Sequence, residues 1–149
     1  MVRHFGLPGW TATQLSSTEG NLQSTLERIK TSTQTYPKLV IILAGTNDLA
    51  YCTNNKDCID IFNSIRSIHD ICHERNIDTV ALSIPTSAWQ SSQNGSDAAS
   101  FAKLINEKIE RWAVERRSIV NAEKEEEEEE QQQLKQPMVH FVPFPIVEY

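Results

Sequence analysis

The sequence lacks the long apolar runs that place a protein in or across a membrane. None of its apolar stretches approaches the roughly 18 residues that a transmembrane helix needs. The start, Met1 to His4, leads directly into fold-like sequence without the apolar core of a signal peptide. We therefore predict no membrane span. The compartment stays open, with the cytoplasm as the default for the sequence as written.

Cysteine is also scarce, with three residues at positions 52, 58 and 72. These cysteines form neither a Cys-x-x-Cys pair nor a cluster with metal-ligand spacing, so no metal site is predicted. We expect reduced, half-buried thiols. A disulfide between Cys52 and Cys58, which would staple the loop that follows Asn47, is the alternative.

The sequence has no basic cluster of the kind that binds nucleic acid. Its 14 Lys and Arg residues are scattered, and the net charge of −6 owes much to the run from Glu125 to Glu130. Residues 122–136 form a Glu/Gln-rich, low-complexity insertion whose like charges repel each other and bury little. This insertion is either a solvated extension of a helix or disordered, and a partner-binding acidic tail is a weaker alternative.

Apolar periodicity predicts alternating strands and helices. The segments 2–5, 39–43, 79–84 and 138–144 read as strands, the last as an edge strand. Helices are expected at 21–33, from the end of the loop 52–56 to about residue 76, and from residue 96 or 97 onward. This order predicts parallel strands in one α/β domain. His69 and His73 are spaced i, i+4, but no third metal ligand is evident, so we place them on the outer face of their helix.

The most informative stretch is Leu39 to Leu49, which reads LVIILAGTNDL. Five apolar residues in succession predict a strand buried on both faces. Gly45 permits a tight turn that presents Asn47 and Asp48 at the carboxyl end of this strand, where α/β sheets carry their chemistry. An Asn amide in this position can donate to a developing oxyanion. The alternative is a turn residue that bonds its own backbone.

A second informative stretch, from Gly6 to Thr11, reads GLPGWT and predicts a tight turn with outward-facing backbone N–H groups. Together the two stretches resemble the SGNH (GDSL) hydrolase family, which has a Gly block followed by a Gly-x-Asn-Asp block after a hydrophobic strand. The resemblance implies a three-layer α/β/α, flavodoxin-like fold with a five-stranded parallel sheet. It also implies hydrolysis of a small carboxylic ester through an acyl-serine, without metal or organic cofactor.

The same resemblance assigns roles to individual residues. The Gly9 N–H and the Asn47 side-chain amide would form part of the oxyanion hole, while Gly45 and Asp48 would support the turn structurally. For Gly9 an ordinary turn glycine is the alternative. Asp48 could instead cap the chain that follows it by accepting backbone N–H bonds.

Two other blocks of the family are not where the resemblance would place them. No Gly-Asp-Ser block precedes Val2, no Asp-x-x-His block follows the last predicted strand, and no Gly-x-Ser-x-Gly replaces the nucleophile. We therefore expect residues 1–149 to form a single partial domain that is inactive alone and self-associates through exposed sheet edges. His140 is expected to pack or to reach solvent rather than to act as a base.

Two further interpretations stay open. The chain could be a non-catalytic binding module of the same fold, with a cleft around Trp10, Asn47 and Trp89 that recognises a carbohydrate, an acyl group or a protein partner. An unrelated flavodoxin-like nucleotide binder is the third possibility. The spacing in GLPGW is not that of Gly-x-Gly-x-x-Gly, and the sequence has no Walker lysine, so this third interpretation is disfavoured.

Overall fold

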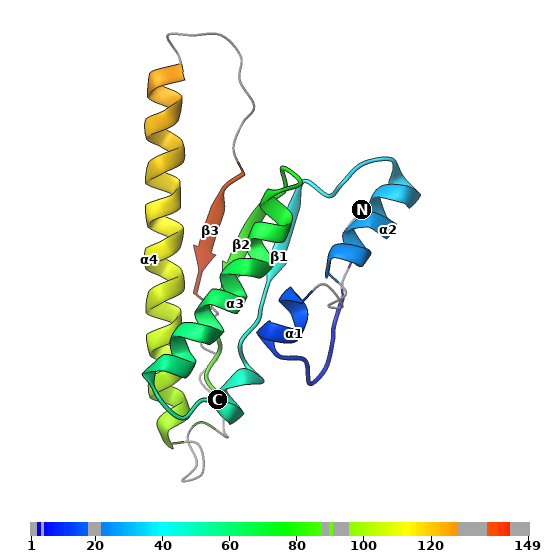
Figure 1. Cartoon of the computed structure of the whole chain (residues 1–149). Coiled ribbons are helices and arrows are strands. Elements are labelled where there is room, and N and C mark those ends of the chain that lie inside the picture. Colours follow the sequence, from blue (N-terminus) through cyan, green and yellow to red (C-terminus); the bar gives the residue numbers. More distant parts are fainter. Residues whose placement is uncertain are drawn as a thin grey trace.

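The computed structural model describes residues 3, 5–17, 22–87, 90, 96–127 and 137–143 (Figure 1). Its elements follow in chain order: α1 (Ala12–Ser16), α2 (Leu22–Thr33), β1 (Leu39–Ile42), the 3-10 helix η1 (Asp48–Tyr51), α3 (Asn55–His73), β2 (Asp78–Leu82), α4 (Ser96–Glu127) and β3 (Val139–Val142).

The three strands of the described chain form one parallel sheet in the order β1-β2-β3. Leu39 pairs with Asp78, and Thr79 pairs with Val139, so the strands start at nearly the same level. Helices α3 and α4 make the two connections between successive strands. The predicted α/β class and the parallel pairing are both confirmed.

Helices α3 and α4 pack side by side over the inner face of the sheet, as Figure 1 shows for α3 in front of β2 and α4 beside β3. Trp112 of α4 joins the two helices, because its ring lies edge-on to Phe62 at 6.4 Å and to His69 at 5.3 Å. The side chains beneath them are buried, including Ile65, Ile105, Ile109, Thr79, Ala81 and Val139. This layer is the hydrophobic core.

The outer face of the sheet corrects one prediction. Leu39, Ile41 and Leu43 are 49%, 63% and 43% exposed, whereas Ile42 is only 8% exposed. The segment 39–43 is therefore buried on one face and not on both. Side chains alternate along a strand, and within the described residues no helix covers the face that carries Ile41.

The predicted strand at residues 2–5 is also not supported. Of its described residues, Arg3 and Phe5 belong to no strand, and the Phe5 side chain is 53% exposed. The physical reason is local, since Gly6, Pro8 and Gly9 turn the chain away immediately afterwards. Arg28 of α2 lies 5.9 Å from the Phe5 ring centre, so this segment contacts α2 rather than the edge of the sheet.

The boundaries of α3 follow from specific caps. The Asn54 side chain accepts hydrogen bonds from the Lys56 and Asp57 N–H groups, which fixes the start of the helix. At its end Asn76 has a φ of 55°, and the Ile77 N–H donates to the Cys72 carbonyl. This left-handed ending stops the helix before the predicted residue 76.

The second connection, α4, continues through residue 127. The first six residues of the segment 122–136 therefore extend this helix, in agreement with one of the two predicted alternatives, and residues 128–136 lie outside the described part.

Helix α2 is attached through one carboxylate to the chain that follows it and to the chain just after α3. Glu27 accepts a hydrogen bond from the Tyr36 hydroxyl at 2.7 Å and one from the Arg75 Nε at 3.1 Å. These two donors lower the pKa of Glu27. Leu26, on the same helix, is 2% exposed, so an ionic contact at the surface accompanies an apolar contact beneath it.

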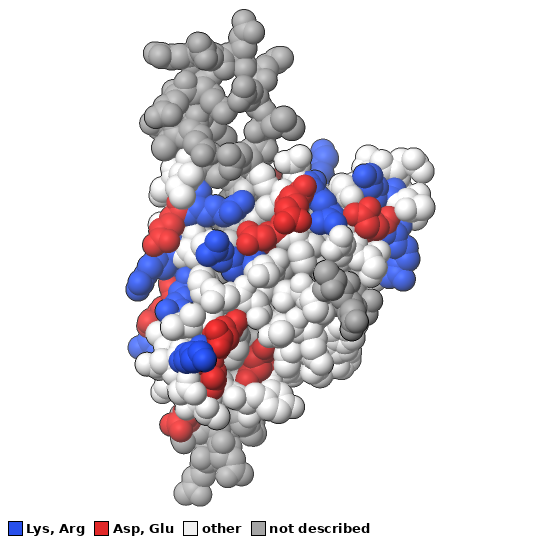
Figure 2. Space-filling view, in the orientation of Figure 1, with Lys and Arg blue, Asp and Glu red and all other residues white. Residues whose placement is uncertain are grey.

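The surface shown in Figure 2 carries basic and acidic side chains intermixed rather than in separate fields. Helix α4 is long, but neither it nor any other described helix is apolar enough to cross a membrane.

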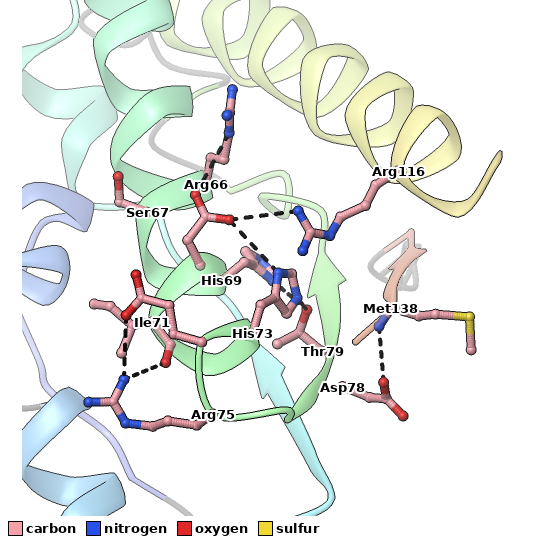
Figure 3. Close-up of polar contacts among 12 residues, drawn as sticks. Arg66, Ser67, His69, Ile71, His73, Arg75, Asp78, Thr79, Arg116 and Met138 are labelled. Atoms are coloured by element: carbon pink, nitrogen blue, oxygen red, sulfur yellow. Dashed lines mark hydrogen bonds and ion pairs between the residues drawn. The ribbon is translucent and has the colours of Figure 1, made fainter. Parts of the chain in front are cut away.

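The two histidines of α3 lie inside the protein, which contradicts their predicted outer position. His69 and His73 are 0% and 7% exposed, and Figure 3 shows both rings directed at Thr79 of β2. The Thr79 hydroxyl lies 2.8 Å from His69 Nδ1 and 2.9 Å from His73 Nε2. A hydroxyl has one hydrogen, so it donates to one ring and accepts from the other. The helix therefore turns a polar pair toward the sheet because β2 supplies a shared partner.

Burial makes these rings hard to protonate. Desolvation, the neighbouring His73 and Arg116 lower the pKa of His69 to about 3. Desolvation and Arg116 lower that of His73 to about 4, against a smaller opposing effect of Asp78. Arg116 itself lies 4.0 Å from the Asp70 carboxylate, which is also 3.8 Å from His73 Nδ1.

We predict that the fold loses stability as the pH falls from 7.5 to 5. Histidine in an unfolded chain has a pKa of about 6.5. Below that pH both histidines are protonated in the unfolded chain but stay neutral in the folded protein, so protonation favours unfolding. The free energy of unfolding should fall by up to about 1.4 kcal/mol per pH unit for each ring. Urea titrations at each pH measure this slope. His69→Gln and His73→Gln should each remove about half of it, and an unchanged slope in both variants would contradict the assignment.

Candidate functional site

The Asn47 side chain reaches the backbone of the Gly9 turn. Its Nδ2 donates to the Trp10 carbonyl at 2.8 Å, across 37 positions of sequence. Asn47 has a φ of −75° at the start of η1 and makes no side-chain cap to its own helix. The alternative of a turn residue that bonds its own backbone therefore does not describe this contact. A primary amide has two N–H groups, so one can hold Trp10 while the other faces a ligand.

Asp48, the next residue, binds the same segment one step further on. Its two carboxylate oxygens lie 3.1 and 2.9 Å from the Ala12 N–H. Ala12 is the first residue of α1, so the carboxylate also lies at a helix amino terminus. Asp48 is 5% exposed, and burial raises its pKa although the bond from Ala12 acts in the opposite direction. Asn47 and Asp48 together hold the backbone from Trp10 to Ala12, and we call this contact the Asn-Asp clamp.

Two glycines with positive φ shape the site. Gly9 has a φ of 81°, and its turn closes through the Trp10 N–H and the Leu7 carbonyl at 3.2 Å, which leaves the Gly9 N–H out of that bond. Gly45 has a φ of 97°, and a Cβ there would lie 2.8 Å from Ile84 Cδ1 and 3.0 Å from Ile65 Cδ1. The Asn47 turn therefore packs directly on the core at a point where only glycine fits.

The chain that leaves β2 is fixed next to this turn. Asn106 of α4 binds both backbone groups of Ile84, with its Oδ1 accepting from the N–H at 2.8 Å and its Nδ2 donating to the carbonyl at 3.0 Å. Further along, the buried Gln90 accepts from the Ser87 N–H and donates to the Pro85 carbonyl. Ile84 thus lies beside Gly45, at the same end of the sheet as Asn47.

A hollow of about 260 Å³ opens between α1, η1 and α3. Hydroxyl and carboxylate groups line much of it, and the exposed Tyr51 stands at its side. Its lining residues are Thr11, Thr13, Asp48, Tyr51, Asp57, Asp60 and Ile61. Within the described part of the chain, no three His, Cys, Asp or Glu side chains are grouped to hold a metal ion.

With this geometry in view, comparison with known families decides the relationship. A family model described as "GDSL-like Lipase/Acylhydrolase family" matches residues 1–141. The chain belongs to this GDSL-like family. No curated protein and no solved structure matches the chain. The resemblance seen in the GLPGWT and Gly-x-Asn-Asp stretches is thereby confirmed at the level of the family.

The residues that the family resemblance singles out gather around the clamp. The structure brings Gly9, Gly45, Asn47 and Asp48 to one end of the sheet, although their individual roles stay predictions. The sequence does contain one Asp-x-x-His triplet, Asp70 to His73. It lies in α3 and contacts Thr79 near the start of β2, whereas Asn47 follows the end of β1. The triplet is therefore at the opposite end of the sheet from Asn47.

Sequence reasoning did not predict some residues near the site, and one predicted residue lies outside the part of the chain that the structure describes. Thr11 and Gln14 form a capping box that starts α1, and the pattern Thr-x-x-Gln is a recognisable signal for it. Asn106 gave no signal, since one Asn on a helix face resembles any solvated polar residue. Trp89, proposed for the alternative cleft, lies outside the described residues. His140 is half-buried, and its Nδ1 is 3.4 Å from an Arg117 nitrogen, so it packs as expected.

We predict that alanine is tolerated far less at Gly45 than at Gly9. Both positions carry the strain of a left-handed residue, roughly 1 to 2 kcal/mol. Only at Gly45 does the new methyl group also meet core side chains, which typically adds about 1 to 3 kcal/mol. Gly9→Ala is the matched control, because a Cβ at Gly9 would have no heavy atom within 4 Å. Urea denaturation should show a loss near 3 kcal/mol for Gly45→Ala and near 1 for Gly9→Ala; equal losses would contradict the packing argument.

Proposed function

We propose that this GDSL-like chain carries the oxyanion-binding half of a site for hydrolysis of carboxylic esters. The Gly9 N–H and the Asn47 amide would hold the negative oxygen of the acyl-transfer intermediate. The observation that supports this is the bond from Asn47 Nδ2 to the Trp10 carbonyl, which keeps the amide beside the Gly9 turn. One such donor is typically worth about 3 kcal/mol of transition-state stabilisation.

The clamp supports the proposal because it restricts the amide before any substrate arrives. One N–H is held by Trp10, Asp48 holds Ala12, and Gly45 packs on Ile84. A donor held in place gains more from a developing charge than one that must reorient, since no reorganisation is needed during the reaction. Asn47 is half-buried, so its environment is drier than water while the side chain still has access to solvent.

We further propose that these 149 residues do not turn over esters alone. The sequence has no Gly-Asp-Ser block, and its Asp70 to His73 triplet lies at the other end of the sheet. A serine nucleophile requires a base within hydrogen-bond reach. The expected chemistry of a complete site is formation and hydrolysis of an acyl-serine without metal or organic cofactor.

The oxyanion site can be tested without catalysis. Ethyl methylphosphonate carries an anionic tetrahedral centre that resembles the acyl-transfer intermediate. In a titration followed by 15N-resolved NMR, the Gly9 amide and both Asn47 side-chain signals should shift together and saturate. Asn47→Ala should weaken binding about tenfold, the loss expected for one hydrogen bond to an anion. Asn63→Ala, an exposed residue of α3, is the control and should bind as the wild type does.

Two outcomes would overturn parts of this proposal. If the Gly9 and Asn47 signals do not respond, or if Asn47→Ala binds equally well, the oxyanion site is wrong. If the purified chain releases p-nitrophenol from its acetate ester with saturation, and Asn47→Ala loses this release, the expected inactivity is wrong. A serine labelled by a fluorophosphonate would likewise identify a nucleophile that we do not predict.

The hollow beside α1 favours a second candidate function, a non-catalytic binding module. Its mixture of hydroxyl groups, carboxylates and the Tyr51 ring suits a small polyhydroxylated ligand such as a sugar. The same NMR titration with monosaccharides separates the two functions. A sugar that shifts Thr13 and Tyr51 while the phosphonate shifts nothing would favour the binding module.

We also propose that the chain self-associates through β1 and the apolar face beside it. Within the described residues β1 pairs only with β2, and Ile41 is 63% exposed. An unpaired strand edge next to apolar side chains is a template for a second copy. The association is homotypic, because the same edge and face exist on every chain.

Sedimentation velocity tests this association. The wild-type chain should show a larger species as its concentration rises over the micromolar range. Ile41→Thr should reduce the amount of that species, because threonine keeps the β-branched shape but is less hydrophobic. Ile59→Thr is the matched control, because Ile59 is 43% exposed and belongs to helix α3 rather than to a strand. A wild-type chain that stays monomeric throughout would contradict the proposal.

A further inference from the structure

Two sulfur atoms are in contact between η1 and α3. The Sγ atoms of Cys52 and Cys58 lie 3.3 Å apart, and both residues are free thiols with 9% and 0% exposure. A disulfide bond is about 2.05 Å long, so the sulfur atoms need to approach by only about 1.3 Å to form one. We propose that Cys52 and Cys58 are an oxidation site, at which a small disulfide such as oxidised glutathione converts the pair to an intramolecular disulfide.

The backbone between the two cysteines is already fixed in a closed loop. The Thr53 N–H and hydroxyl both donate to the Asp57 carboxylate, at 2.8 and 2.7 Å. Asn54 caps α3 by accepting from Lys56 and Asp57, and the Cys58 N–H donates to the Asn54 carbonyl. These bonds hold the sulfur atoms together in the reduced protein, so oxidation requires little further ordering of the chain.

The site is not a fast sensor in the folded protein. Burial, with the neighbouring Cys58, raises the pKa of Cys52 to about 12, so very little thiolate exists at neutral pH. Neither sulfur is open to a large oxidant. The pair is therefore oxidised when the segment 48–58 opens transiently or while the chain folds.

The reaction balances as a thiol–disulfide exchange. The Cys52 thiolate attacks one sulfur of oxidised glutathione and releases a glutathione thiolate, which takes up the proton that Cys52 lost. The Cys58 thiolate then attacks the Cys52 sulfur of the mixed disulfide and releases the second glutathione. Two protein thiols lose two electrons and two protons, and the oxidant gains them as two glutathione thiols.

The consequence for the fold is a covalent link beside the Asn-Asp clamp. Cys52 directly follows η1, which itself begins directly after Asn47, and Cys58 lies in the first turn of α3. The disulfide closes a short loop and thereby lowers the conformational entropy of the unfolded chain around η1. This inference does not rest on the proposed esterase site, and its test does not use activity.

The positions of Lys and Arg make the test direct. Trypsin cleaves after Lys38, Lys56, Arg66 and Arg75, so Cys52, Cys58 and Cys72 fall in the separate peptides 39–56, 57–66 and 67–75. The full chain is equilibrated, and in parallel refolded, in glutathione buffers from reducing to oxidising. Free thiols are then blocked with N-ethylmaleimide in denaturant. Mass spectrometry should find the 39–56 and 57–66 peptides linked under oxidising conditions, and the 67–75 peptide blocked throughout.

Cys72 provides the matched control. It lies fourteen positions after Cys58 on α3, or about 21 Å along the helix axis, so it cannot join the pair in the folded chain. Cys72→Ala should keep the linked peptides, and Cys52→Ala should abolish them. The oxidised wild-type chain should melt about 5 °C above the reduced chain, and Cys52→Ala should show no such difference.

Three results would overturn the inference. In the first, both thiols stay open to blocking at the most oxidising ratio, in the equilibrated and in the refolded chain alike. In the second, Cys72 is linked as often as Cys52 or Cys58. In the third, the linked chain melts no higher than the reduced chain, which would show that the disulfide does not fit the folded geometry.

Discussion

The Asn-Asp clamp is the contact on which the arrangement of the site depends. Helix α1 has five residues, which is too short to be stable alone, and the described residues that precede it belong to no strand. What holds this segment is side-chain bonding from the turn after β1, together with packing of α1 on α3. The position of the Gly9 turn is thus set by residues more than thirty positions away in the sequence.

The two residues of the clamp, Asn47 and Asp48, differ in burial and in charge. Asp48 is enclosed, and its carboxylate has the Ala12 N–H as a fixed donor. Asn47 is half-buried and uncharged, so it can hold a backbone carbonyl without the cost of placing an ion in a dry environment. This arrangement gives a buried carboxylate on the core side and a half-buried, hydrogen-bonded amide on the solvent side.

Much of the fold could be predicted from apolar spacing. The strands near 39–43 and 79–84 and the helix over α3 were expected because long periodic segments carry a strong signal. The exposure of the outer face of β1 was not expected. Five apolar residues in a row predict a strand buried on both faces, whether or not a second layer covers the sheet. Helix α1 has only five residues, too few to show a helical period of apolar side chains. The clamp partners Trp10 and Ala12 carry no side-chain signal, since the clamp binds their backbone.

The inward position of His69 and His73 shows a different limit of sequence reasoning. The spacing i, i+4 places two residues on one helix face but does not say which face. The deciding residue is Thr79, which by itself reads as an ordinary strand threonine. Its hydroxyl lies within hydrogen-bond reach of both rings, and this partner comes from another element.

That shared hydroxyl makes the three positions energetically interdependent. Replacing Thr79 by valine would keep the shape of the side chain but deprive both imidazoles of their partner at once, so the cost would exceed that of losing one bond. Exchanging all three residues for apolar ones of similar volume could leave the core nearly as stable. Substitutions here are therefore non-additive, and homologous sequences should keep this polar trio together or lose it together.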